Sequence, residues 1–141
     1  MGEDLIATCV YAVFDPATQA PTLANAGHLP PALMTDDGDV RLLDYHLGPL
    51  LGVPDTSYRE QSVGFPSGHR LLLFTDGLVE HRGRHLDKGL HALHRWLESA
   101  HGPLDELCRN VTEALLDRST QDDDVTVLAI ANTQAKGRPT I

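Results

Sequence analysis

The chain has 141 residues, a length that fits one domain and argues against two independent hydrophobic cores. Apolar residues make up 41% of it, which excludes general disorder. A net charge of −9 argues against a nucleic-acid or membrane-surface partner. No apolar run approaches the roughly 20 residues of a membrane span, and no secretory signal opens the chain. We therefore expect a cytoplasmic protein, with Cys9 and Cys108 as buried free thiols.

The first half of the chain predicts short strands joined by tight connections. The predicted strands are residues 6–14, 22–26, 32–34, 40–43 and 58–63. The first of them is apolar at nearly every position, which predicts a strand buried on both faces. We expect the first two strands to form one antiparallel hairpin and the next two to form a second. Residues 47–54 predict an ordered loop packed on the body, because its leucines would be costly to expose.

The second half predicts a central strand, two helices and a last strand. These are residues 70–74, 88–100, 103–115 and 125–131. Because the early connections are hairpins, a doubly wound parallel sheet is excluded and an α+β fold with mainly antiparallel sheets is favoured. Strands that are apolar on both faces need cover on both sides, which a sandwich of sheets with flanking helices provides. We expect a single domain over residues 1–131 and a frayed tail over residues 132–141.

Carboxylates stand at the ends of two strongly apolar strands. Asp76 follows the strand at residues 70–74, and Asp122, Asp123 and Asp124 precede the last strand. If these two strands are antiparallel neighbours, the carboxylates meet at one rim of the sheet. Clustered carboxylates repel one another unless a cation neutralises them, and oxygen ligands suit magnesium, manganese or calcium. The alternatives are a plain turn at Asp76-Gly77 and a solvated loop before the last strand.

Histidines offer a second, weaker signal. His81, His85, His91 and His94 lie near or on the first predicted helix, but no cysteine or carboxylate completes a zinc site, so a solvated helix face is favoured. His28 follows Gly27 in a tight turn at the end of a strand. It is either a turn histidine bonded to the backbone or a residue next to a functional site. The sequence contains no serine-histidine-aspartate elbow, phosphate-binding glycine loop or Cys-x-x-Cys pair.

Four sequence motifs occur in a fixed order along nearly the whole chain, from about residue 4 to 130. They are Ala24-Asn25-Ala26-Gly27-His28-Leu29-Pro30-Pro31, Leu50-Leu51-Gly52-Val53, Leu73-Phe74-Thr75-Asp76-Gly77-Leu78-Val79-Glu80 and Asp123-Asp124-Val125-Thr126-Val127-Leu128. Each motif alone is weak, but together they resemble the bacterial SpoIIE/RsbU-type branch of the metal-dependent (PPM) protein serine/threonine phosphatases.

The resemblance implies an αββα sandwich with a two-metal site, holding manganese or magnesium, at one end of its sheets. By their places in the motifs, Asp76 and Asp123 are implied to be catalytic metal ligands. Asp124 takes the next place of its motif as a further metal-site residue, and Gly77 and His28 are adjacent to the site. Asp122 lies outside the pattern and would only add negative potential.

The resemblance also implies a reaction and a partner. Metal ions lower the pKa of a bound water and neutralise charge as it attacks phosphorus, so no protein nucleophile is needed. The usual substrates of the family are phosphoserine or phosphothreonine on small regulatory proteins such as anti-anti-sigma factors. The alternative is a non-catalytic, phosphatase-like interaction module in a sigma-factor regulatory pathway.

The chain departs from the family pattern at its beginning. The family's early Gly-Gly-Asp strand and its Asp-Gly-His-Gly turn have no counterpart in this sequence. We therefore expect the C-terminal part of a catalytic domain, with the N-terminal part missing and with little activity by itself. Strands that lose their neighbours gain open edges, so residues 6–14 or 125–131 are expected to pair with a second copy and form a homodimer.

Overall fold

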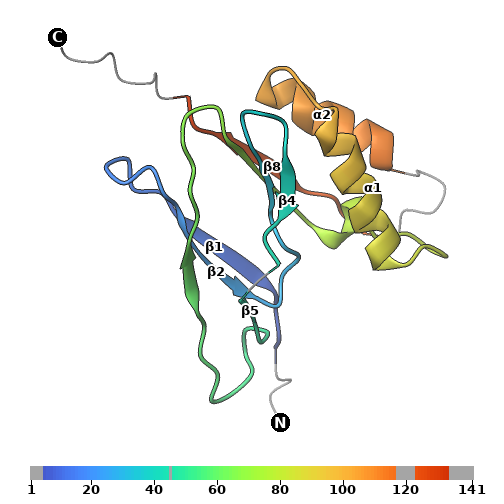
Figure 1. Ribbon diagram of the computed structural model, residues 1–141. Coiled ribbons are helices and arrows are strands. Elements are labelled where there is room, and N and C mark those ends of the chain that lie inside the picture. Colours follow the sequence, from blue (N-terminus) through green and yellow to red (C-terminus); the bar gives the residue numbers. More distant parts are fainter. Residues whose placement is uncertain (1–4, 45, 117–122, 134–141) are drawn as a thin grey trace. The chain divides into compact units, whose positions relative to one another are not determined.

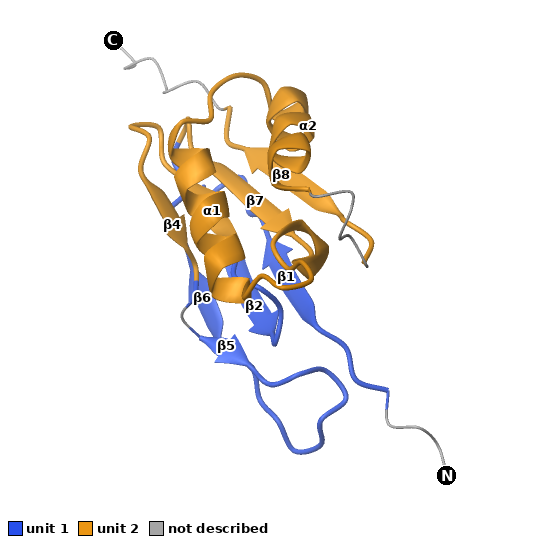
Figure 2. Cartoon of the chain, turned by 90° about the vertical axis from the view of Figure 1, so that its right-hand side faces the viewer, with its two compact units in different colours: residues 1–30, 44–66 blue, residues 31–43, 67–141 orange. Residues whose placement is uncertain are grey.

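The computed structural model describes residues 5–44, 46–116 and 123–133 (Figure 1). Their elements, in chain order, are β1 (Cys9–Val13), β2 (Thr22–Ala26), β3 (Ala32–Met34), β4 (Val40–Leu42), β5 (Leu47–Gly48), β6 (Glu60–Ser62), β7 (Arg70–Phe74), α1 (Leu86–Glu98), α2 (Leu104–Leu115) and β8 (Val127–Ala131). They form two compact units, one of residues 1–30 and 44–66 and one of residues 31–43 and 67–141 (Figure 2). Neither helix of the described ranges is long and apolar enough to cross a membrane.

The first unit is built around β2. β1 and β6 pair with β2 in antiparallel fashion and the short β5 pairs with it in parallel. The predicted hairpin of β1 and β2 is therefore confirmed. The prediction that the first strand is buried on both faces is wrong, because Tyr11 is 65% and Val13 47% exposed. These two side chains lie beside their small cross-strand partners Ala24 and Thr22, whereas the buried Leu23 lies on the opposite face.

The segment predicted as a packed loop is ordered through its backbone. β5 pairs with β2, and Ala7 and Leu51 exchange two backbone hydrogen bonds of 3.1 and 2.9 Å. The expected burial of its apolar side chains is wrong, since Leu47, Leu51 and Val53 are all exposed. Backbone hydrogen bonds satisfy the N–H and C=O groups that pair in this segment, and they do so without burying its apolar side chains.

The second unit is a sheet in the order β4-β3-β7-β8, with every neighbouring pair antiparallel. α1 packs against β3, β4 and α2, and α2 packs against β8 (Figure 2). β7 lies inside the sheet, as its apolar run predicts. The fully buried core contains Leu33, Leu71, Leu72, Leu93, Leu97, Leu107 and Val111. An α+β fold with mainly antiparallel sheets is thus confirmed, and α1 begins two residues before its predicted start.

The turn between β3 and β4 is closed by Thr35. Its N–H donates to the Asp39 carbonyl at 2.9 Å, and its hydroxyl accepts from the Asp39 N–H at 3.0 Å and donates to the Asp37 carboxylate. This hydroxyl, followed by the backbone N–H groups of Asp37 and Asp39, holds the pKa of the Asp37 carboxyl below its ordinary value.

A Thr35→Val substitution is therefore expected to raise the pKa of Asp37 towards its ordinary value. Since the folded pKa lies below the unfolded one, ionised Asp37 stabilises the fold above its ordinary pKa, and that contribution disappears as the pH falls through the lowered value. An NMR titration of the Asp37 carboxyl carbon in both proteins measures this. Thr18→Val, in the separate turn at Asp15, is the control and should leave Asp37 unchanged.

Candidate functional site

The pairing of β7 with β8 brings two candidate segments together. The two strands are antiparallel, with Phe74 opposite Val127, and the ladder continues through the Thr75 N–H, which donates to the Thr126 carbonyl at 3.0 Å. The end of β7 thus meets the beginning of β8. Asp76 follows the one and Asp123 and Asp124 precede the other, so the antiparallel neighbours expected from sequence are present.

Thr75 also joins these segments through its side chain. Its hydroxyl accepts a hydrogen bond from the Thr126 N–H at 2.9 Å and donates to the Asp124 carbonyl at 3.4 Å. A threonine at a strand end could have pointed to solvent; here it satisfies backbone groups on both sides of Val125. The carboxylate-bearing backbone before β8 is therefore attached directly to the residue that precedes Asp76.

Asp76 opens a single turn of 3₁₀ helix, Asp76–Leu78. Its carbonyl accepts from the N–H groups of Val79 at 2.9 Å and Glu80 at 2.7 Å. Leu78 and Val79 are fully buried and anchor the turn, while the Asp76 side chain is exposed. Gly77 is required here, because a Cβ atom would lie 2.6 Å from the Asp124 carbonyl oxygen. The turn therefore lies directly against the Asp124 backbone.

The donor chemistry at this rim suits a hard divalent cation. Asp76, Asp123 and Asp124 are exposed carboxylates at neighbouring strand ends, and oxygen ligands are those that magnesium and manganese prefer. Within the described ranges, no group of three or more histidine, cysteine or acidic side chains is close enough to hold a metal as it stands. Asp122 lies outside the described residues.

His28 sits in a rigid turn of the first unit. The buried Asn25 accepts from the His28 N–H at 2.8 Å through its side-chain oxygen and donates to the His28 carbonyl at 3.0 Å. Nδ1 of His28 lies 3.0 Å from the Leu29 carbonyl oxygen. Since a carbonyl only accepts, Nδ1 carries a hydrogen in this contact. This geometry is that of the backbone-bonded turn histidine, and a role next to the site stays a prediction.

Two of the histidines on or near α1, His94 and His81, bond to the backbone through their side chains. His94 Nε2 donates to the Val40 carbonyl at 2.8 Å, and its Nδ1 lies 3.7 Å from Glu98. His81 Nε2 lies 2.9 Å from the Leu115 carbonyl oxygen. The sequence indicated His81 only as a weak zinc candidate, and it indicated Thr75 only as one residue of a family motif. A hydroxyl next to Asp76 was a signal for the bonds that Thr75 makes to the other strand. No sequence signal indicated the bond between His81 and Leu115.

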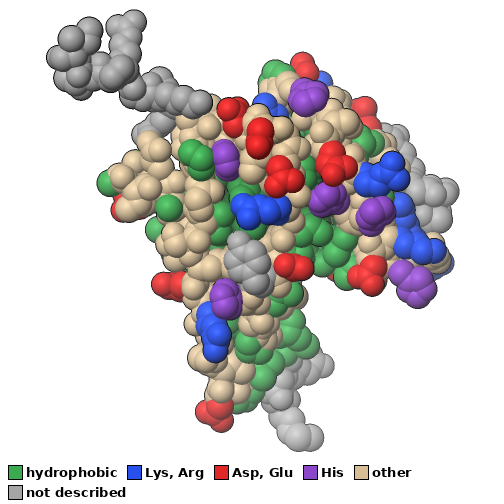
Figure 3. Space-filling view, viewed as in Figure 1, with side chains coloured by type: hydrophobic (Ala, Val, Ile, Leu, Met, Phe, Trp, Pro, Cys, Tyr) green, Lys and Arg blue, Asp and Glu red, His purple; other side chains and the backbone are tan. Residues whose placement is uncertain are grey.

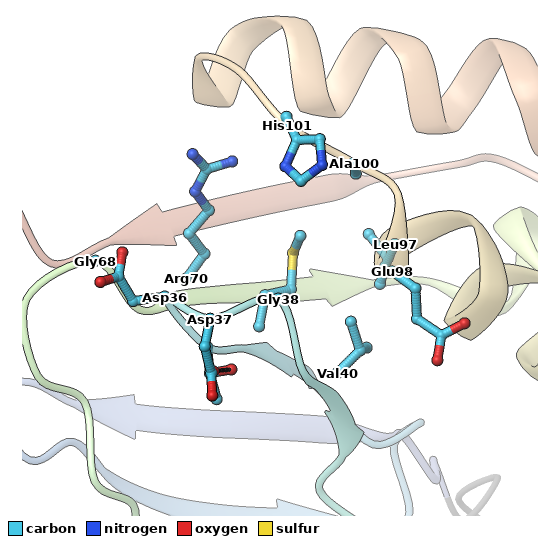
Figure 4. A pocket seen from close by; sticks show the side chains of 12 residues that line it. Asp36, Asp37, Gly38, Val40, Gly68, Arg70, Leu97, Glu98, Ala100 and His101 are labelled. Carbon is cyan, nitrogen blue, oxygen red and sulfur yellow. Dashed lines mark hydrogen bonds between the residues drawn. The ribbon is translucent and has the colours of Figure 1, made fainter.

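A cavity of about 190 Å³ lies elsewhere in the second unit, between the β3–β4 turn, β7 and the end of α1 (Figure 4). Asp36, Asp37, Arg70, Glu98 and His101 are its charged and histidine lining residues. Arg70 begins β7 and Asp76 follows its end, so the cavity and the carboxylate rim are about 20 Å apart along the strand. Acidic, basic and histidine side chains all reach the surface on the face shown in Figure 3.

Comparison with known proteins identifies the family. The protein-family model described as Stage II sporulation protein E (SpoIIE) matches residues 1–132. The chain belongs to the SpoIIE family. Among curated proteins, this SpoIIE-family chain is 36% identical over 74 residues to phosphoserine phosphatase RsbP of Bacillus subtilis (strain 168). The aligned part is 52% of this chain and 18% of RsbP.

Solved structures confirm the fold of this SpoIIE-family chain. The RsbU and RsbW domains of Rv1364c from Mycobacterium tuberculosis match with a TM-score of 0.76 and 32% identity, over 86% of this chain and 35% of that one. The phosphatase domain of the cell fate determinant SpoIIE from Bacillus subtilis matches with a TM-score of 0.74 and 14% identity, over 94% and 61%. A manganese-presoaked structure of that domain matches with a TM-score of 0.73 and 14% identity, over 94% and 59%. The chain thus spans less than two thirds of each of these proteins.

Proposed function

We propose that this chain is part of a cytoplasmic, metal-dependent phosphoprotein phosphatase domain. Its substrate would be phosphoserine or phosphothreonine on a regulatory protein such as an anti-anti-sigma factor. Membership of the SpoIIE family supports the reaction class, as does the likeness to RsbP, whose name describes a phosphoserine phosphatase. The likeness to the RsbU and RsbW domains of Rv1364c supports a regulatory partner.

The observation that carries the proposal is the β7–β8 rim. Asp76 and Asp123 are the proposed metal ligands, with Asp124 as a further metal-site residue and Gly77 and His28 adjacent to the site. The exposed carboxylates of the three aspartates would hold manganese or magnesium. The manganese-presoaked SpoIIE structure supports manganese. When bound, such ions supply a nucleophilic water at neutral pH and neutralise phosphoryl charge. The chain's own part is to fix the carboxylates at the sheet end and leave them open to substrate.

A second candidate function is a non-catalytic interaction module of the same regulatory pathway. One observation favours it: among the described residues, no three metal-binding side chains lie close enough together to hold an ion. In either case we propose that the chain forms a homodimer through an open sheet edge, since β1 and β8 each pair with one named strand in the described part.

Calorimetric titration with manganese chloride tests the metal site. The wild-type chain should bind manganese, and Asp76→Asn should weaken binding by at least about tenfold, because a direct ligand is at least as important as the groups that orient it. Glu113→Gln removes one exposed carboxylate of α2 and is the matched control, with affinity unchanged. Manganese should also raise the melting temperature of the wild type, since it binds the folded state.

The outcomes separate the two candidates. Hydrolysis of p-nitrophenyl phosphate that requires manganese and is lost in Asp76→Asn supports the phosphatase. Manganese binding without turnover, both in this chain and in a longer chain that covers the whole family domain, supports the interaction module. A wild-type chain that neither binds manganese nor gains stability from it would remove the metal site at this rim and the phosphatase proposal with it.

A further inference from the structure

We propose that the outward face of α1 is a docking surface for an acidic helix of a partner protein. Four side chains, here called the cationic stripe, lie along this face: Arg84, just before the helix, and Lys88, His91 and Arg95 on it. The surface lies within the second unit and does not depend on the metal site proposed above.

The cationic stripe lies opposite the buried face of α1. Gly89, Leu93 and Leu97 are the buried residues of the helix. With about 3.6 residues per turn, the positions of the stripe fall on the other side. Three of its side chains are exposed and that of Arg84 is half-buried. In Figure 2, no other described element of the second unit covers this side of α1, so the stripe is open to a partner.

The charge of this stretch is opposite to that of the whole chain. Residues 82–95 contain four of the 11 lysines and arginines and one of the 20 acidic residues, which leaves a charge of +3 in a chain of net charge −9. Within the described ranges, Arg84, Lys88 and Arg95 form no ion pair, not even with Asp87 between them. Their charge is therefore available to carboxylates of another molecule.

Helix stability does not account for these positions. Arg84 lies just before α1 and Lys88 lies in its first turn, where the helix dipole disfavours positive charge. Only Arg95, in the last turn, is placed as the dipole prefers. Departures from local preference of this kind are expected at functional surfaces, where another requirement decides the residue.

A central row of side chains divides this face into two grooves. Asp87, His91 and Arg95 follow one another at every fourth position, and all three line a shallow hollow on either side. The two hollows have volumes of about 580 and 670 Å³. Rows of this spacing on one helix pack into the grooves of another. The shape of the face therefore suits a helical partner.

The two hollows differ in chemistry. Arg84 and Lys88 line the smaller one, whereas the apolar side chains of Leu42 and Leu90, with Glu98, line the larger one. A partner helix with carboxylates along one side and apolar side chains beside them complements both. A long polyanion such as nucleic acid is disfavoured, because the chain as a whole carries a charge of −9.

Fluorescence anisotropy with a labelled model peptide tests this surface. The probe is an alanine-based helix with glutamates at the spacing of the cationic stripe and leucines beside them, and a second peptide has glutamine in place of each glutamate. The stripe variant carries Arg84→Gln, Lys88→Gln and Arg95→Gln. The matched control carries Arg41→Gln, Arg59→Gln and Arg109→Gln, which remove the same charge from exposed positions elsewhere.

We expect the wild type and the matched control to bind the glutamate peptide more tightly than the glutamine peptide. The stripe variant should bind the glutamate peptide roughly 3- to 150-fold more weakly than the wild type, since three exposed ion pairs are lost. Added salt should weaken the binding. The stripe variant should melt close to the matched control, because its cations do not serve the fold.

Equal weakening in both triple variants would assign the effect to net charge and overturn the proposal. A wild type that does not distinguish the two peptides, or a stripe variant that melts far below the matched control, would overturn it as well. Tighter binding of a labelled DNA duplex would replace the partner helix with a nucleic acid, and a homodimer that only the stripe variant dissociates would replace it with a second copy. Manganese binding should be the same in all these proteins, so failure at α1 leaves the metal site untouched.

Discussion

Replacing Gly89 with alanine should unfold the second unit or lower its free energy of unfolding by at least about 4 kcal/mol, the range of the most disruptive single substitutions. Gly89 is a buried residue in the first turn of α1. A Cβ atom there would lie 1.8 Å from the Val79 carbonyl oxygen and 2.7 Å from the carbonyl carbon. Both are backbone atoms, so no side-chain rotation can relieve the clash.

The direction of this effect opposes helix propensity. In an exposed helix interior, alanine is about 1 kcal/mol more favourable than glycine. Here the helix must approach the Val79 backbone, which follows the buried end of the Asp76 turn. Alanine would push α1 away from this segment and expose the core contacts of Leu93 and Leu97. The close approach, and not helix formation, is therefore the reason for glycine at this position.

Urea unfolding followed by circular dichroism measures the change. Ala92→Gly, one turn of the same helix away, is the matched control and should cost only the propensity difference of about 1 kcal/mol. A Gly89→Ala protein that is as stable as the wild type, or more so, would contradict the packing of α1 against Val79.

The parts of the fold that the sequence predicted are those in which local pattern and environment agree. Residues 71–74 form an apolar run, and with Arg70 they became the strand between β3 and β8. Pro103 and the apolar stripe from Leu104 to Leu115 predicted α2, which begins one residue after the predicted start, with Pro103 as its N-cap. The convergence of Asp76 with the carboxylates before β8 followed from one assumption, that these strands are antiparallel neighbours, and the register bears it out.

The parts that were missed depend on partners distant in sequence. Gly89 looked like an ordinary interruption in a helix, because its reason is the Val79 backbone ten residues earlier. His81 bonds to a carbonyl 34 residues away, and no local pattern encodes such a pair. The apolar character of β1 was read as burial, but composition does not say whether a neighbour covers a face. The exposed side chains of Tyr11 and Val13 show that no described residue covers this face of β1.

That open face leads to the last prediction, that the chain self-associates through β1. In the described part, nine of the ten exposed large apolar side chains belong to the first unit, and Leu128 of β8 is the exception. β1 contains no charged residue and no proline, the features with which edge strands usually avoid pairing. Only β2 among the named strands pairs with it. A second copy could add its own β1 and cover Tyr11 and Val13 in the same step.

Lysine at both positions, Tyr11→Lys with Val13→Lys, should therefore give a monomer. Each side chain is at least 47% exposed, so the single chain loses little when it is replaced. Fully burying such a side chain contributes about 1.5–3 kcal/mol, so each lysine should weaken the dimer by more than about tenfold. Sedimentation over a range of protein concentrations measures the equilibrium. Leu128→Lys places one lysine at the β8 edge, and its comparison with the single variant Tyr11→Lys distinguishes the two edges.

The comparison of these variants decides the interface. Dissociation by Tyr11→Lys, with Leu128→Lys still dimeric, assigns the contact to β1, because one added lysine then matters at only one edge. Dissociation by Leu128→Lys alone would move the interface to β8 and refute the argument from the exposed face of β1. A wild-type chain that stays monomeric at every concentration would show that exposed tyrosine and valine on an uncharged edge are insufficient for pairing, and the homodimer would have to be abandoned.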